Sequence, residues 1–155
     1  MEATWDGLPI SPSPPYGAAV IVWCRTADGP RFLLLRRAHL SDPGSREWLW
    51  GPPAGARLPG EDIGACAVRE LREETGLRGP VAPGPHGTPD RAVYTLELPA
   101  AADAVLSEEH DRFRWAAARE VAELVWPERV QAPLLAVAGG AAVARGEGRR
   151  GGAGI

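Results

Sequence analysis

The sequence predicts one α/β domain in which a mixed β-sheet lies between helices. Three observations lead to this prediction. Two apolar runs of strand length come first, at 17–24 and 32–36. A proline-free segment with helical periodicity, 63–75, follows them. Further strand-like and helix-like segments come after that helix, and a sheet with strands on both sides of a central helix is covered by helices in such folds.

The first part of the chain predicts an arm, a hairpin and a loop. The segments expected are an extended proline-rich arm at 1–15, a strand at 17–24, a turn at 28–30, a strand at 32–36, a polar loop at 38–47 and a short strand at 48–50. Asp28-Gly29-Pro30 is a turn sequence, so the first two strands should form a hairpin.

The central helix is expected from Ile63 to Thr75 because both of its ends carry signals. Asp62 can cap the first turn, since a short carboxylate accepts hydrogen bonds from the free amides there. Gly76 can end the helix in the left-handed conformation. Ala67 and Leu71 lie on one apolar stripe with the spacing of a helix that packs on a core.

Three carboxylates of this helix should share another face. Glu70, Glu73 and Glu74 fall at positions i, i+3 and i+4, which are neighbours on a helix surface. Like charges at these spacings repel, and a cation between them would remove that penalty. Ligands that are all oxygen suit Mg²⁺, with Mn²⁺ as a substitute, better than Zn²⁺.

The second half of the chain completes the domain. The segments expected are a loop at 79–89, strands at 92–98 and 113–116, helices at 117–124 and 127–138, and a disordered tail of glycine and arginine at 140–155. The domain itself should therefore span 16–139. No internal repeat is evident.

Composition narrows the class of protein. Hydrophobic residues make up 45% and charged residues 24%, as in ordinary globular proteins. The formal net charge of -3 gives no support for nucleic acid as a partner. Cys24 and Cys66 are expected to be buried free thiols. The sequence shows no signal peptide and no apolar run that could span a bilayer, so a cytoplasmic protein is expected.

The segment from Gly55 to Leu77 resembles the sequence box of the Nudix hydrolases. The matching residues are Gly55, Glu61, Arg69-Glu70-Leu71, Glu73-Glu74 and Gly76-Leu77. Every position that the box specifies is matched, and the resemblance extends more weakly from about 17 to 138. It implies the Nudix α/β/α sandwich and hydrolysis of a phosphoric anhydride on a divalent cation.

The resemblance also implies roles for residues of the box. Glu70, Glu73 and Glu74 would hold metal, and the backbone carbonyl of Ala54 would be a further ligand. Ala54 stands where the family more often has glycine. Arg69 would brace Glu70 or Glu61 by paired hydrogen bonds. Glu61 would support the metal shell, Arg69 or the substrate.

Residues outside the box resemble parts of particular Nudix branches. Arg36 and Arg37 end a predicted strand where many family members contact substrate phosphates, and a guanidinium fits a phosphate. The stretch from Glu108 to Trp115 is similar to one in the nucleoside triphosphate (MutT-like) and dihydroneopterin triphosphate pyrophosphohydrolases. There a loop glutamate serves as metal ligand or base, and Glu109 is the better match, with Glu108 in reserve.

Some neighbouring side chains have open roles. His110 could be a second base or a group that stacks on a nucleobase, or neither. Trp48 and Trp126 are the tryptophans best placed to stack on a base, whereas Trp23, Trp50 and Trp115 are expected to belong to the core.

The expected function is therefore a Mg²⁺-dependent pyrophosphohydrolase acting on a nucleoside di- or triphosphate derivative. Glu70 or Glu109 would be the general base, and the sequence does not decide between them. Other expected substrates are ADP-ribose, a nucleotide sugar or a dinucleoside polyphosphate. An alternative of another class is a module that senses a nucleotide without cleaving it. No nucleic acid or membrane partner is expected, and a homodimer stays open.

Overall fold

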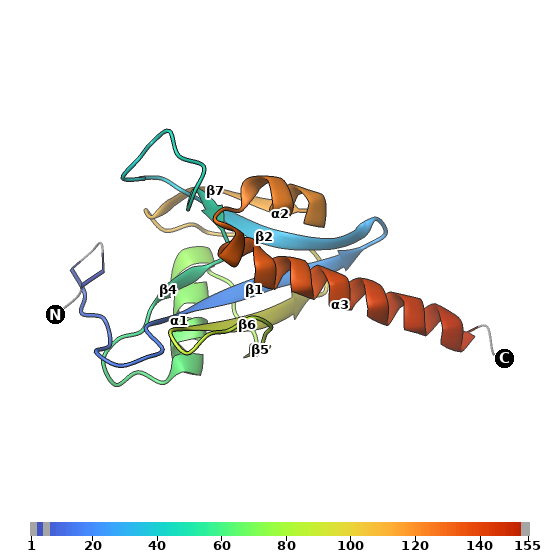
Figure 1. Cartoon of the computed structure of the whole chain (residues 1–155), viewed down its shortest axis with the longest axis horizontal. Helices are drawn as coiled ribbons and strands as arrows, with labels where there is room; N and C mark the ends of the chain where they lie inside the picture. Colours follow the sequence, from blue (N-terminus) through green and yellow to red (C-terminus); the bar gives the residue numbers. More distant parts are fainter. Residues whose placement is uncertain (1–2, 5–6, 153–155) are drawn as a thin grey trace.

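A mixed sheet of seven strands forms the centre of the molecule (Figure 1). The computed structural model describes the backbone of residues 3–4 and 7–152, and side chains as far as residue 141. The elements are β1 (Gly17–Thr26), β2 (Gly29–Arg37), β3 (Trp50–Gly51), β4 (Ala54–Ala56), α1 (Ile63–Thr75), β5 (Ala82–Pro83), β6 (Arg91–Leu98), β7 (His110–Ala116), α2 (Ala118–Leu124) and α3 (Glu128–Gly152).

Strand β1 is the central strand of the sheet. It pairs antiparallel with β2 through the predicted hairpin, with Trp23 opposite Phe32. On its other side it pairs parallel with β6, with Gly17 beside Arg91. The start of β1 and the start of β6 therefore lie side by side, and the end of β2 points toward the same edge of the sheet, where β4 pairs with β1 and β3 pairs with β2. This edge carries the site described below.

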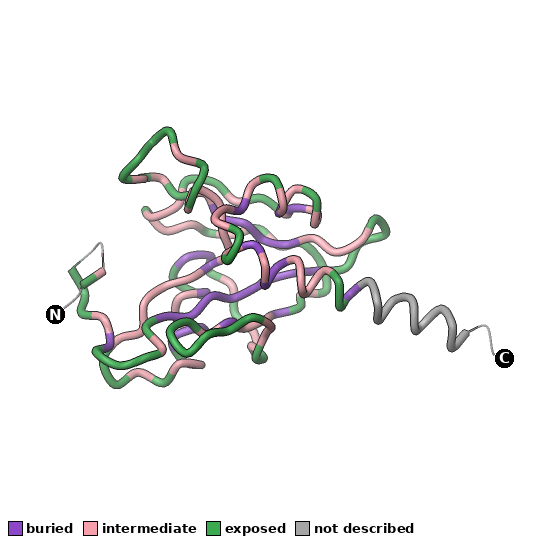
Figure 2. Tube along the Cα trace, viewed as in Figure 1, coloured by how far each residue is buried: buried purple, intermediate pink, exposed green. Residues whose placement is uncertain are grey.

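The two faces of the sheet bury separate cores, which confirms the predicted α/β/α sandwich. On one face Ile21, Trp23 and Leu34 pack in a cluster with residues of α2 and α3. On the other face Val20 and Leu33 pack with Cys66, Ala67 and Leu71 of α1, and all of these residues are buried. Because side chains of a strand alternate between faces, β1 and β2 serve both cores at once. Figure 2 shows the resulting concentration of buried residues along these two strands.

Two local predictions need correction. The short strand expected at 48–50 is instead β3, Trp50–Gly51, and a separate strand, β4, follows at Ala54–Ala56. Pro52 and Pro53 lie between them and have no backbone N–H to donate, so a continuous ladder is broken there. The loop expected at 79–89 contains the two-residue strand β5.

The C-terminal helix runs further than 138, where the sequence-based helix ends. Helix α3 continues to Gly152, and Ala141 is buried in the core on the α2 and α3 side. Side chains beyond 141 lie outside the described residues, as do residues 1–2 and 5–6 of the predicted arm. The predicted boundary between domain and tail therefore stays a prediction.

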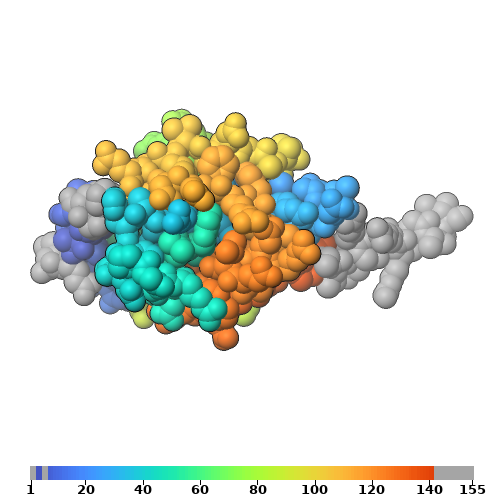
Figure 3. All heavy atoms as spheres, turned by 90° about the horizontal axis from the view of Figure 1, so that it is seen from above, coloured from blue at the N-terminus to red at the C-terminus, as the bar shows by residue number. Residues whose placement is uncertain are grey.

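Three further features of the fold concern the cysteines, membrane-spanning helices and the loop between β2 and β3. Cys24 and Cys66 are both free and buried, as expected. Among the described residues no helix has the length and apolar character needed to cross a bilayer. The loop between β2 and β3 lies beside α2 and the start of α3 on one face of the molecule (Figure 3). The backbone N–H of Trp48 donates to the carbonyl of Trp126 there, at 2.7 Å.

Candidate active site

A cavity of about 950 Å³ opens at the sheet edge where β1 and β6 start and β2 ends. The charged residues and histidines that line it are Arg37, Arg69, Glu70, Glu73, Glu74, His86, Asp90, Arg91, Glu109, His110 and Arg129. Its volume is in the range of sites that bind small molecules. The cavity thus joins the carboxylates of α1 with residues from distant parts of the chain.

Helix α1 sets the position of the carboxylates. Asp62 caps it as predicted, and its side chain accepts a hydrogen bond from the N–H of Ala65 at 3.0 Å. Gly76 ends it with a φ of 74°, in the left-handed region. The apolar stripe of the helix packs against β1. This packing fixes the rotation of the helix, so Glu70 and Glu74 line the cavity.

Arg69 holds the acidic residues in place. Its guanidinium donates to both carboxylate oxygens of Glu61, at 2.8 and 2.9 Å, and to Oε1 of Glu70 at 2.9 Å. It also donates to Oε2 of Glu73 at 3.2 Å and to the carbonyl of Ala56 at 2.9 Å. The hydrogen bonds with Glu61 are the largest cause that raises the pKa of Arg69. The same hydrogen bonds are the largest cause that lowers the pKa of Glu61. Arg69 therefore acts as a clamp that holds Glu61, Glu70 and Glu73 together.

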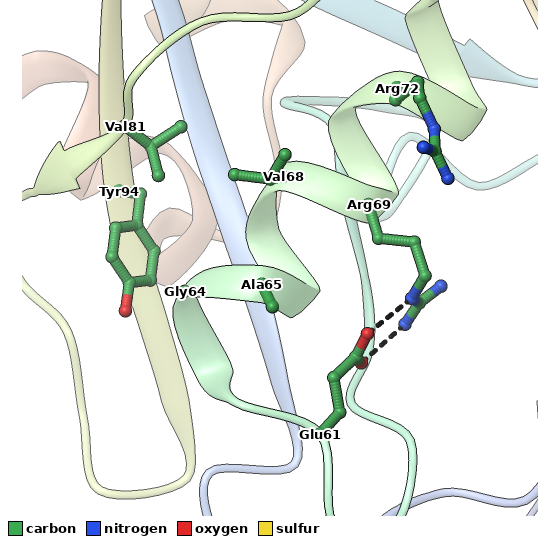
Figure 4. A pocket seen from close by; sticks show the side chains of 8 residues that line it. All are labelled: Glu61, Gly64, Ala65, Val68, Arg69, Arg72, Val81 and Tyr94. Carbon is green, nitrogen blue, oxygen red and sulfur yellow. Dashed lines mark hydrogen bonds and ion pairs between the residues drawn. The ribbon is translucent and has the colours of Figure 1, made fainter.

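Glu61 belongs to this clamp and not to the lining of the large cavity. Figure 4 shows its two hydrogen bonds with Arg69 at the rim of a second, more open hollow of about 620 Å³ on the outer side of α1. Glu61 also accepts a hydrogen bond from the N–H of Leu58 at 3.1 Å. Its oxygens are thus occupied by protein donors, which favours the predicted support of Arg69 over contact with substrate.

Glu70 is packed onto the backbone of Gly55. A Cβ at position 55 would lie 2.0 Å from Cδ of Glu70, so no side chain fits there. Burial raises the pKa of Glu70, and the charge of Arg69 opposes that shift. The first glycine of the sequence box therefore has a steric role, because it lets the carboxylate lie against the chain.

Glu74 is the most unusual group of the site. Its side chain is buried, with the residue only 2% exposed. Oε2 accepts a hydrogen bond from the N–H of Ala54 at 3.0 Å, while Oε1 is buried and has no hydrogen-bond partner among the described residues. Burial first, then the charges of Glu109 and Glu70, raise its pKa well above the ordinary value. An isolated buried carboxylate is costly unless a cation or donor compensates it.

Glu109 and His110 complete a group around Glu74. One ligand atom from each of the three residues lies within 4.8 Å of the other two. Burial, followed by the charge of Arg37, lowers the pKa of His110 to about 4, so its ring is neutral at pH 7. Its Nδ1 is buried and has no hydrogen-bond partner in the described part of the chain. The unpaired oxygen of Glu74 and the acidic neighbours fit a hard divalent cation.

The other residues predicted for the site fall into two groups. Arg37 lines the cavity, whereas Arg36 does not and lies 3.8 Å from a carboxylate oxygen of Asp111. Glu73 lines the cavity, but its side chain is 51% exposed and paired with Arg69. Ala54 lines the cavity as well. The structure therefore brings together all the predicted site residues except Arg36 and Glu61.

The two tryptophans considered for base stacking differ in position. Trp48 lines the cavity, and the guanidinium of Arg129 lies 5.0 Å from its ring centroid. Trp126 does not line it, and Arg46 covers its ring at 4.1 Å. Sequence reasoning missed Arg91 and Arg129 because each is an isolated arginine at the start of an element. Only the pairing of β6 with β1 and the docking of α3 reveal that they share a cavity.

Comparison with known proteins places this fold and site in a family. A model of the NUDIX domain matches residues 15–136. No curated protein matches the chain in sequence.

Solved structures show the same fold. A Nudix hydrolase from M. smegmatis, RenU, has a TM-score of 0.65 at 20% identity, covering 87% of this chain and 91% of its own. The C. elegans Ap4A hydrolase has a TM-score of 0.60 at 23% identity, covering 80% and 97%. The E. coli dihydroneopterin triphosphate pyrophosphohydrolase has a TM-score of 0.57 at 20% identity, covering 79% and 93%.

These identities establish the fold and leave the branch of the family open. The match over residues 15–136 spans most of the chain and includes the carboxylates that the cavity gathers. Nudix domains act on nucleotide-type compounds, and the family typically works with a divalent metal. The chain belongs to the Nudix family and is a hydrolase of phosphoric anhydrides.

Proposed function

We propose that this protein is a Mg²⁺-dependent pyrophosphohydrolase of nucleoside di- or triphosphate derivatives. One observation carries the proposal. A buried carboxylate, Glu74, leaves one oxygen without a partner and faces Glu109 and His110 within 4.8 Å. A polyanionic substrate would be repelled by such a cluster, so a cation has to lie between them.

The residues that would hold the ion are Glu70, Glu74 and Glu109, with Glu73 and the carbonyl of Ala54 as further ligands. When bound, Mg²⁺ polarises phosphoryl oxygens and lowers the pKa of a water that it binds. Mn²⁺ could replace it, since both ions take oxygen ligands. Arg69 keeps Glu70 in one orientation through the hydrogen bond at 2.9 Å.

The reaction also needs a base and a group that binds the phosphates. Glu70 or Glu109 would accept the proton of the attacking water. The raised pKa of Glu70 brings it closer to neutral pH, which suits a general base. Arg37, at the end of β2 beside the cluster, would bind a substrate phosphate through its guanidinium.

The identity of the substrate is tested by a screen with product analysis. The purified protein is incubated with about thirty nucleotide derivatives chosen to cover the classes of Nudix substrate. They include nucleoside triphosphates, dihydroneopterin triphosphate, ADP-ribose, nucleotide sugars and dinucleoside polyphosphates. We expect hydrolysis of an anhydride bond in at least one of them with Mg²⁺, seen as pyrophosphate or phosphate from a triphosphate or as two phosphorylated products from the other compounds, and none in excess EDTA.

Two results would contradict the proposal. Full turnover in excess EDTA would remove the role of the metal. Saturable binding of a nucleotide without any hydrolysis product would instead identify a module that senses a nucleotide. Product analysis separates these outcomes, because only hydrolysis yields a shortened nucleotide.

A further inference from the structure

We propose that the cavity has a second anion site, formed by Arg37, Arg91 and Arg129, which binds a substrate phosphate beyond those that metal ions at the carboxylates would hold. This inference rests on the proposed function. It names the substrate class as nucleotides with three or more phosphates in a row, including dinucleoside polyphosphates, in preference to compounds with only a diphosphate.

Three separate elements bring these arginines to one cavity. Arg37 is the last residue of β2 and Arg91 is the first of β6. Arg91 lies beside the start of β1, whereas Arg37 lies where β2 pairs with β7. Arg129 lies in the first turn of α3. The next residue, Val130, packs near Gly51 of β3, because its Cγ1 lies 3.8 Å from the position that a Cβ on Gly51 would take. All three arginines line the cavity.

None of the three arginines is neutralised by a close carboxylate in the described part of the chain, although the charge of Arg37 acts on the nearby Glu74. Among the described residues no ion pair within 4.0 Å involves any of the three, whereas Arg25, Arg36, Arg69 and Arg114 each have at least one. Asp90 also lines the cavity and forms no ion pair with them. The pKa of Arg91 is lowered by burial and then by the charges of Arg37 and Arg129, as expected for cations that face one another. An anion between them would relieve this repulsion.

Arg129 is held by an aromatic surface. Its guanidinium lies over the ring of Trp48, 5.0 Å from the centroid. Stacking uses the face of the planar group and leaves the N–H edges free for phosphate oxygens. Trp48 has a φ of 66°, a left-handed conformation that is unfavourable for a bulky residue.

The arginine site and the carboxylates are neighbours in the cavity. Arg37 lies opposite His110 in the pairing of β2 with β7, next to Glu109. A substrate whose reacting anhydride lies at the carboxylates therefore meets Arg37 at its next phosphate. Further phosphates lead toward Arg91 and Arg129. On this proposal, a substrate with only two phosphates would leave Arg91 and Arg129 without a phosphate to bind.

The test compares one nucleoside carrying two, three or four phosphates, with Mg²⁺ present. The double variant Arg91→Gln, Arg129→Gln is measured beside wild type, and Arg119→Gln is the matched control. Arg119 is exposed on α2 and does not line the cavity. A second measurement titrates inorganic tripolyphosphate into each protein by calorimetry in excess EDTA. Circular dichroism confirms that the variants are folded.

We expect wild type to prefer three or four phosphates over two by at least about tenfold in kcat/KM, because each charged hydrogen bond contributes about a factor of ten or more. The double variant should lose this preference and bind tripolyphosphate at least about tenfold more weakly. Arg119→Gln should match wild type in both assays. Lysine at positions 91 and 129 should restore part of the binding, because it keeps the charge without the fork.

Contrary results can be assigned to one proposal or the other. Equal activity on two and three phosphates, or an equal loss on all of them in the double variant, would overturn the second anion site and leave the hydrolase intact. If no nucleotide is cleaved, the proposed function fails. Equal affinity of wild type and double variant for tripolyphosphate would then overturn the anion site as well.

Discussion

At the scale of single residues, the buried carboxylate of Glu74 decides how the site works. One oxygen is bonded to the N–H of Ala54 at 3.0 Å and the other has no partner among the described residues. We expect Glu74→Gln to lower kcat by at least about 100-fold, since it removes a key charge while keeping shape. Steady-state kinetics on the best substrate measure this. A variant near the wild-type rate would place the active site elsewhere.

Without metal, Glu74→Gln should leave the stability of the protein unchanged or raise it, although the substitution lowers kcat. The pKa of Glu74 is raised above its ordinary value of 4.5, so the unfolded chain ionises at lower pH than the folded protein. The stability contributed by the protonated form is complete below 4.5 and is lost as the pH rises through the folded-state pKa. In EDTA, Glu74→Gln should therefore match or exceed the Tm of wild type, more so at about pH 7.5 than at about pH 4. A Tm difference that shrinks as the pH rises would contradict this assignment.

Gly55 offers a steric test of the site. A Cβ there would lie 2.0 Å from Cδ of Glu70, so Gly55→Ala must displace that carboxylate or the strand. We expect a loss of about 1–3 kcal/mol in stability, as for other overpacked positions, and at least about tenfold in kcat. Gly139→Ala is the control, because nothing lies within 4 Å of its Cβ position on α3. It should be neutral or stabilising by up to about 1 kcal/mol. Equal kinetics for both variants would remove the steric role of Gly55.

At the scale of elements, local signals predicted helix α1 well and the strand ends poorly. Asp62 and Gly76 mark its ends in the sequence, and both act as caps in the structure. The strand expected from Phe113 begins instead at His110. That start depends on the pairing of His110 with Arg37 of β2, which is distant in sequence and has no local signal. His110 therefore looked like a loop residue, although it belongs to the group around Glu74.

The proline-rich arm shows a similar limit. Its composition predicts an extended segment, but its attachment depends on Arg57, a position that the sequence box leaves unspecified. Arg57 donates to the carbonyl of Pro15 at 2.7 Å, to that of Ser13 at 2.8 Å and to Oγ of Ser11 at 2.9 Å. It also donates to the carbonyl of Glu61 at 3.0 Å, which links the arm to the loop before α1. Leu8, Ile10 and Tyr16 of this region line the cavity.

Substitution of Arg57 tests whether the arm is a working part of the cavity. We expect Arg57→Ala to lower stability by about 1–3 kcal/mol, since it leaves several polar partners unsatisfied. KM should rise by a larger factor than kcat falls, because the arm lines the cavity away from Arg69 and the carboxylates that it binds. Arg119→Ala on α2 is the control and should change neither. Unchanged KM with lowered stability would mean that the arm only supports the fold.

At the scale of the whole molecule, the two cores fix the sheet between helices, and this keeps the residues of the site in defined positions. Helix α1 packs on one face of the sheet, while α2 and α3 pack on the other. The pattern of apolar runs predicted these layers. It could not predict that β6 pairs parallel to β1, because that pairing joins segments far apart in the chain. This pairing puts Arg91 at the same edge as Arg37.

The last prediction concerns how much of the chain the site needs. Ala141 is buried in the core, and every described residue that lines the cavity precedes it. Beyond 141 the sequence is rich in glycine and arginine, so this last part of α3 has few apolar side chains with which to bury surface. Removal of residues 142–155 should therefore leave Tm and kcat/KM nearly unchanged. Deletion from 139 onward, which removes Ala141 as well, should lower Tm and serves as the contrasting variant. A fall of more than about tenfold in kcat/KM for the shorter deletion would mean that the segment contributes to substrate binding, with its arginines as the groups to test next.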